Sequence, residues 1–207
     1  MSSPIVGSSA QTAMSNAPIF QQDRFIARQK IIALAPQFRF TDLNGNTLAF
    51  LRQKVLTLKD EIHVYTDDTL TTELLLIKAR QIIDWGAAFD VTDSITHQKV
   101  GTLKRRGWKS LLRAEWTIMD AQDQEIGKFQ EGSKLLAFLR RTVSKLLPQS
   151  YNFEIRGQQV GIVKQRVAFL APRMDADFST DPGRTLDRRL AAAAVVLLMS
   201  VEGREQK

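Results

Sequence analysis

The chain has 207 residues, 43% of them hydrophobic and 25% charged, which is ordinary for a soluble globular protein of one large or two small domains. It contains no cysteine, which excludes disulfides, thiolate zinc sites and cysteine nucleophiles, and its two histidines make a histidine-rich metal site unexpected. The formal net charge of +7 favours acidic partners, either anionic lipid or nucleic acid.

The N-terminal segment lacks the features of a secretory signal. Residues 1–19 carry no charged side chain and no sustained apolar run, so we expect a disordered tail over 1–19. The longest apolar run, residues 190–199, is shorter than the roughly 20 residues that a membrane-spanning helix needs. We therefore expect no transmembrane segment and a cytoplasmic protein, with peripheral membrane attachment as an option.

A short motif repeats along the chain, in which two basic residues are separated by one residue, as in Arg28-Gln29-Lys30. We call the first residue of this motif the basic marker. It begins at Arg28 and recurs at Arg52, Lys78, Lys104, more weakly at Gln130, and at Lys164. A glycine lies three residues before the last three of these positions, at Gly101, Gly127 and Gly161. Internal repeats of this length indicate one supersecondary unit used many times.

Each repeat carries two strand signals separated by a turn. In residues 151–156, for example, Tyr151, Phe153 and Ile155 alternate with polar residues, which is typical of a sheet with one solvated face. Aspartate-led turns such as 42–46 and 120–124 separate the strands. Six units predict a mainly β fold of about twelve antiparallel strands in meander order, and closure into a barrel would remove the exposed edges.

Two segments have helical rather than strand patterns. Residues 133–147 predict an inserted amphipathic helix, which either caps a barrel end or lies in a membrane interface. Near the C-terminus, Asp181 is the expected N-cap and Pro182 the first residue of a helix over 182–202 that ends at Gly203. This helix is apolar on every side, so we expect it inside the barrel. The predicted domain spans 20–203, followed by a tail over 204–207.

The repeated basic strands, the aspartate-led turns and the terminal apolar helix that begins with Asp187-Arg188-Arg189 resemble the LURP-one-related and phospholipid scramblase families. Their shared tubby-like fold implies a twelve-stranded barrel threaded by a C-terminal helix. For function, the resemblance implies roles that range from plant defence to lipid scrambling and phosphoinositide tethering. Tubby-like proteins bind phosphoinositide head groups through a Lys-x-Arg pair on a strand, and several pairs in this chain match that short pattern.

Basic residues two positions apart on a strand share one face, so the repeated markers would present charge together. If the meander is regular, some pairs line up across the barrel wall and attract phosphates; the alternative is a solvated outer face that discourages edge pairing. The densest run also contains Trp108, which either packs on its strand or serves an interface. The candidate lipid- or anion-binding residues are Lys78, Arg80, Lys104, Arg105, Arg106, Lys109, Lys164 and Arg166.

Asp175, Asp177 and Asp181 precede the final helix, where scramblases carry an acidic segment proposed to bind calcium. The glycine of a calcium loop is absent and Leu186 replaces its last ligand, so a turn and a helix N-cap are the favoured interpretation. We expect no metal site and no cofactor.

The sequence contains no nucleophile elbow, P-loop or dinucleotide fingerprint, which favours a protein that is not an enzyme. The leading hypothesis is a binding module that docks its basic outer face on anionic phospholipid or an acidic partner. A scramblase-like lipid transporter, a nucleic-acid-binding barrel and a scaffold for an unknown protein partner are the alternatives. The nucleic-acid hypothesis is weaker because a clear set of stacking aromatics is absent.

Overall fold

The structure is a computed structural model, and it describes residues 16–30, 36–52, 61–80, 87–106, 115–132, 149–166 and 172–202. The predicted inserted helix over 133–147 and the candidate residue Lys109 lie outside these described ranges.

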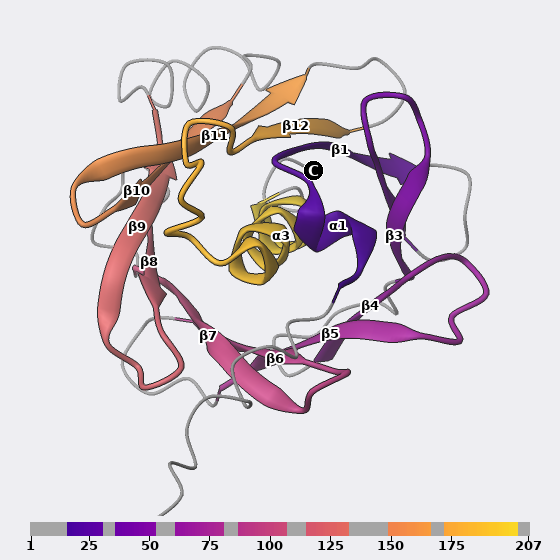
Figure 1. The fold of residues 1–207 in the computed structure, drawn as a ribbon, viewed down its shortest axis with the longest axis horizontal. Coiled ribbons are helices and arrows are strands. Elements are labelled where there is room, and N and C mark those ends of the chain that lie inside the picture. Colours follow the sequence, from indigo (N-terminus) through magenta and orange to yellow (C-terminus); the bar gives the residue numbers. More distant parts are fainter. Residues whose placement is uncertain are drawn as a thin grey trace, which may run out of the picture.

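Twelve antiparallel strands form one closed barrel in which each strand pairs with its neighbours in sequence and the first strand pairs with the last (Figure 1). The predicted fold class and meander order are therefore confirmed. The strands are β1 (Arg24–Lys30), β2 (Gln37–Thr41), β3 (Thr47–Arg52), β4 (Glu61–Tyr65), β5 (Glu73–Ala79), β6 (Ala88–Asp93), β7 (Gln98–Arg105), β8 (Glu115–Met119), β9 (Glu125–Glu131), β10 (Ser150–Ile155), β11 (Gln158–Arg166) and β12 (Arg173–Asp177).

The inward face of the barrel is aromatic along one stretch of the wall. Trp116 lies opposite Phe129 in the β8–β9 pair, and Phe129 lies opposite Phe153 in the β9–β10 pair. The ring centroids are 5.5 Å apart in the first pair and 4.7 Å apart in the second, and all three side chains are fully buried. Stacked rings on neighbouring strands help to fix the register, since a slip of one residue would turn them outward.

The repeat in the sequence corresponds to a repeated β-bulge. Each odd-numbered strand from β3 to β11 has one extra residue near its start that the preceding strand does not pair with. A bulge bends the strand and increases its twist, which helps a long meander to close. The residue after the bulge in β7 is Gly101, where a side chain would collide with the Met119 carbonyl oxygen and press on the Leu190 side chain of the central helix. The extra residues are Leu48, Leu74, Val100, Ile126 and Val160.

The C-terminal helix α3 (Arg188–Leu197) lies in the middle of the ring of strands and continues as a π-helical turn, η1 (Leu198–Glu202) (Figure 1). Residues 190–199 are all buried, as expected for a helix that the barrel surrounds.

The predicted start of the helix was wrong. Asp187, whose carboxylate accepts a hydrogen bond from the Arg189 N–H, is the N-cap, and the helix begins six residues later than expected from Pro182. Asp181 instead closes a turn, because its side chain accepts the backbone N–H groups of Thr185 and Leu186.

The predicted domain boundary at Phe20 was also late. The short helix α1 (Pro18–Gln21) packs against α3, and Ala17, Ile19 and Phe20 are buried (Figure 1). Proline at the first helical position favours this turn, and the two large apolar side chains cover one end of the barrel core.

Candidate functional site on the outer barrel wall

The charge of the barrel is divided between two parts of its wall. Strands β11, β12, β1, β2 and β3 together carry eight basic and two acidic residues, a net charge of +6. The other seven strands carry five basic and eight acidic residues, a net charge of −3. We call the outer surface of β11, β12, β1, β2 and β3 the basic face. The positive surplus of the strands is therefore concentrated on less than half of the circumference.

Four arginines lie side by side across the basic face. Arg173 on β12 pairs in register with Arg166 on β11 on one side and with Arg28 on β1 on the other, and Arg28 in turn pairs with Arg39 on β2. Neighbouring strands are about 4.8 Å apart, so this arginine row spans roughly 14 Å. Residues opposite each other in antiparallel strands point to the same face. Phe25 and Ala27 are buried inside the barrel, which places Arg28 outside.

Asp175 holds two members of the row together. Its Oδ2 accepts a hydrogen bond from Arg166 Nε at 2.8 Å, and its Oδ1 accepts one from Arg173 Nε at 2.6 Å. Burial would raise the pKa of Asp175, but these two guanidinium contacts outweigh it and keep the pKa below its ordinary value. The carboxylate is therefore ionised at neutral pH, and it balances one of the two positive charges that it contacts.

The remaining basic residues of this face are only partly compensated. Arg39 contacts Asp68 at 2.9 Å and lies over the Phe50 ring, and Arg24 contacts Asp177 at 3.1 Å. Four further basic side chains are exposed and have no acidic partner within the described part of the chain. They are Arg28, Lys30, Arg52 and Lys164.

Two of the predicted site residues are neutralised on the opposite part of the wall. Lys78 forms an ion pair with Glu61 at 2.6 Å. Arg80 contacts Asp90 and Asp123, each at 2.7 Å, and these hydrogen bonds raise the pKa of its guanidinium. Their charges are committed to the barrel surface, so this pair is a poor anion site.

The basic run on β7 is also dispersed by the structure. Lys104 is exposed, whereas Arg105 lies opposite the buried Trp116 and therefore shares the inward side of its strand. Arg106 follows β7 and pairs with Glu115 at 3.1 Å. Within the described part of this run, Lys104 is therefore the exposed cation without an acidic partner, whereas Lys164 and Arg166 on β11 belong to the basic face.

The sequence alone missed Arg39 and Arg173. Both lie on even-numbered strands, where the basic marker does not occur, and neither belongs to a basic pair. Only the pairing of β1 with β2 and with β12 brings them next to Arg28. Arg173 and Arg28 are far apart in the sequence, so they become neighbours only when β12 pairs with β1 and closes the barrel.

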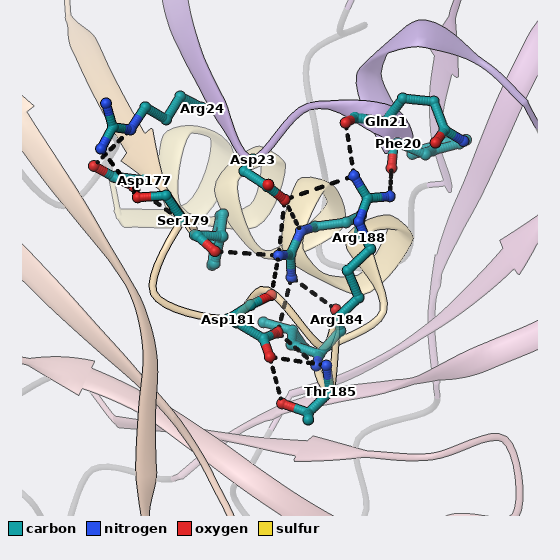
Figure 2. Close-up of polar contacts among 12 residues, drawn as sticks. Phe20, Gln21, Asp23, Arg24, Asp177, Ser179, Asp181, Arg184, Thr185 and Arg188 are labelled. Atoms are coloured by element: carbon teal, nitrogen blue, oxygen red, sulfur yellow. Dashed lines mark hydrogen bonds and ion pairs between the residues drawn. The ribbon is translucent and has the colours of Figure 1, made fainter.

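The three aspartates before the final helix each contact an arginine. Besides Asp175, Asp177 contacts Arg24, and Asp181 contacts Arg188 Nη1 at 3.0 Å (Figure 2). Within the described residues no group of three or more His, Asp or Glu side chains is arranged to hold a metal ion. The favoured interpretation of Asp181 as an N-cap was wrong, but its part in a turn is confirmed.

The Asp187-Arg188-Arg189 sequence at the start of α3 fixes the helix to the barrel. Arg188 donates to Asp23 and Asp181 and to nearby backbone carbonyls, and its side chain is only 3% exposed (Figure 2). Arg189 contacts both Asp187 and Asp93. These charges have a structural function and are separate from the basic face.

Comparison with known proteins gives a family for most of the chain. Residues 47–198 match the model of the LURP-one-related family. A solved X-ray structure of a protein from Arabidopsis thaliana is similar, with a TM-score of 0.49 and 13% sequence identity; the match covers 86% of this chain and 91% of that chain. No curated protein matches. Among the described residues, no helix is both long and apolar enough to cross a lipid bilayer.

Proposed function

The chain belongs to the LURP-one-related family, and from that premise we propose that it is a non-catalytic module that binds anionic phospholipid head groups through its basic face. It would act as a peripheral protein on a cytoplasmic membrane surface. The proposal keeps the predicted kind of partner and the predicted residues Lys164 and Arg166 on β11, but it moves the rest of the site from β5 and β7 to the wall around β1.

The observation that supports this proposal is the arginine row together with the unpaired basic residues around it. Ion pairs neutralise most basic side chains on the other strands, so a membrane would gain little by contacting them. On the basic face, Arg28, Lys30, Arg52 and Lys164 can each exchange solvent for a phosphate without first breaking an ion pair within the described residues.

The expected affinity follows from the number of these residues. Each Lys or Arg near an anionic membrane contributes about 1 kcal/mol, so four contribute roughly 4 kcal/mol. Alone, that corresponds to millimolar binding, and stronger attachment requires several lipids in contact with the face at once. Because the interaction is electrostatic and exposed, it should weaken steeply as salt is added.

Vesicle co-sedimentation tests the proposal. We expect the protein to sediment with vesicles that contain phosphatidylserine at low salt, to stay in the supernatant with phosphatidylcholine alone, and to be released by high salt. The double variant Arg28→Glu/Lys164→Glu should lose at least about tenfold in apparent affinity, since two attractive charges become repulsive.

The matched control is Lys78→Glu/Lys104→Glu, which changes the net charge equally on the opposite wall. It should bind nearly as well as the natural protein. Equal loss in both double variants would show that overall charge, and not the basic face, determines binding. A lack of sedimentation with any anionic vesicle, combined with tight salt-sensitive binding to a single-stranded oligonucleotide, would favour the nucleic-acid alternative.

A further inference from the structure

We propose that the arginine row selects phosphate monoesters over phosphodiesters and carboxylates of equal total charge, with Asp175 as its positioning residue. This inference rests on the proposed function and adds the chemical class that the basic face prefers. It arises from the arrangement of the arginines and not from their number alone.

The contacts of Asp175 use one specific donor of each arginine. A guanidinium has five N–H donors in a rigid planar fork. In Arg166 and Arg173 the Nε–H donates to Asp175, and the terminal nitrogens have no hydrogen-bond partner within the described residues. One carboxylate thereby restricts both side chains and leaves eight terminal N–H donors for an external acceptor. Because the side chains are already restricted before binding, they lose less conformational entropy when a ligand binds.

Arg28 adds a third guanidinium beside this pair. It lies directly opposite Arg173, and Arg39 lies opposite Arg28 on the other side. Adjacent strand positions are about 5 Å apart, so the ends of neighbouring arginine side chains can reach one small anion. Arg39, Arg166 and Arg173 each contact an aspartate, whereas Arg28 has no acidic partner within the described residues. Arg28 is therefore the arginine of the row that can bind an external anion most readily.

A phosphate monoester suits such a site better than the head groups of most anionic lipids. It carries a charge of about −1.5 to −2 and three terminal oxygens, each able to accept hydrogen bonds from a different guanidinium. A phosphodiester has one charge and two free oxygens, so it can engage fewer of the clustered donors. The same chemistry occurs in phosphatidic acid on a membrane and in soluble phosphate esters.

The test compares vesicles that contain either phosphatidic acid or phosphatidylserine, adjusted to the same surface charge. We expect roughly tenfold or greater preference for phosphatidic acid, the size of one additional charge-assisted hydrogen bond. Arg28→Lys keeps the charge but loses the planar fork, so it should retain phosphatidylserine binding and lose most of the preference.

Asp175→Asn separates positioning from simple charge. The variant gains one positive charge, so binding to phosphatidylserine should hold or rise, whereas the preference for phosphatidic acid should fall because Arg166 and Arg173 lose their common anchor. If Asp175 only competes with ligands, the variant would bind both vesicles more tightly with the preference intact, and its positioning role would be overturned. Circular dichroism and the urea midpoint establish that each variant is folded.

Calorimetric titration with glycerol 3-phosphate distinguishes the two sources of the monoester. Saturable binding that Arg28→Lys weakens would support a site that recognises the group in solution as well. Binding confined to phosphatidic acid vesicles would support a site that recognises it only on lipid. Equal affinity for the two vesicle types at matched charge would overturn the selectivity while leaving membrane binding in place. Failure to bind either vesicle would instead contradict the proposed function itself.

Discussion

Replacement of Arg188 by Met should lower the free energy of unfolding by about 3–5 kcal/mol, the usual result of removing one partner from a buried ion pair. The Arg188–Asp181 pair is 3% exposed on both sides, and the same guanidinium also binds Asp23 and the carbonyls of Phe178 and Leu186 (Figure 2). Methionine fills similar volume but leaves these acceptors unsatisfied. Typical domains are stable by only 5–15 kcal/mol, so the urea midpoint should fall substantially.

Two further variants show whether the loss comes from the unpaired acid. Arg184→Met removes a partly exposed arginine that binds the carbonyls of Phe20 and Gln21, and it should cost less than about 1 kcal/mol. Arg188→Met/Asp181→Asn removes both charges and should recover part of the stability, because the remaining amide oxygen can still accept the Thr185 N–H. An Arg188→Met protein as stable as Arg184→Met would contradict the assigned role of this pair.

Ala193→Asp should also abolish or severely weaken folding. Ala193 is fully buried in the middle of α3, where the barrel surrounds the helix. A carboxylate at this position would have no access to water. The buried Arg188 could not compensate it, because it is already paired with Asp23 and Asp181, so the change should cost several kcal/mol. The expected result is insoluble protein or loss of the cooperative urea transition.

The control for this change is Ala121→Asp in the turn between β8 and β9. The same carboxylate is there close to solvent, and the stability should change by less than about 1 kcal/mol. Soluble Ala193→Asp protein with a cooperative transition near that of the control would contradict the central position of the helix.

The sequence predicted the barrel because its main determinants are local and repeated. Period-two alternation placed Phe153 and its neighbours on the inner face, and the uniformly apolar run over 190–199 required a surrounding wall. The regular spacing was correctly recognised but its cause was not, since a bulge becomes visible only when two strands are paired. The start of α3 was misplaced because Asp181 and Asp187 are both plausible N-caps in sequence. Only the folded chain shows that Asp181 accepts the N–H groups of Thr185 and Leu186 and so closes a turn.

The site was harder to predict because charge compensation is not local. Lys78 and Lys164 belong to similar basic pairs in the sequence, yet Glu61 neutralises the first while the second is unpaired within the described residues. The arginine row depends on the closure between β12 and β1, which no short motif encodes. A register drawn from the predicted meander would have placed Arg28 opposite Arg39, and that is the signal from which the basic face could have been found.

Site-specific labelling tests the position of the basic face directly. Because the chain has no cysteine, an introduced cysteine is the single thiol that a fluorophore can label. A cysteine replacing Gln37, between Lys30 and Arg52 in the strand pairing, and another replacing Gln98 on β7 would each carry an environment-sensitive fluorophore. When vesicles containing phosphatidic acid are added, we expect a blue shift and quencher protection at residue 37 and little change at residue 98. Protection at residue 98 without protection at residue 37 would contradict the assignment of the membrane-binding surface.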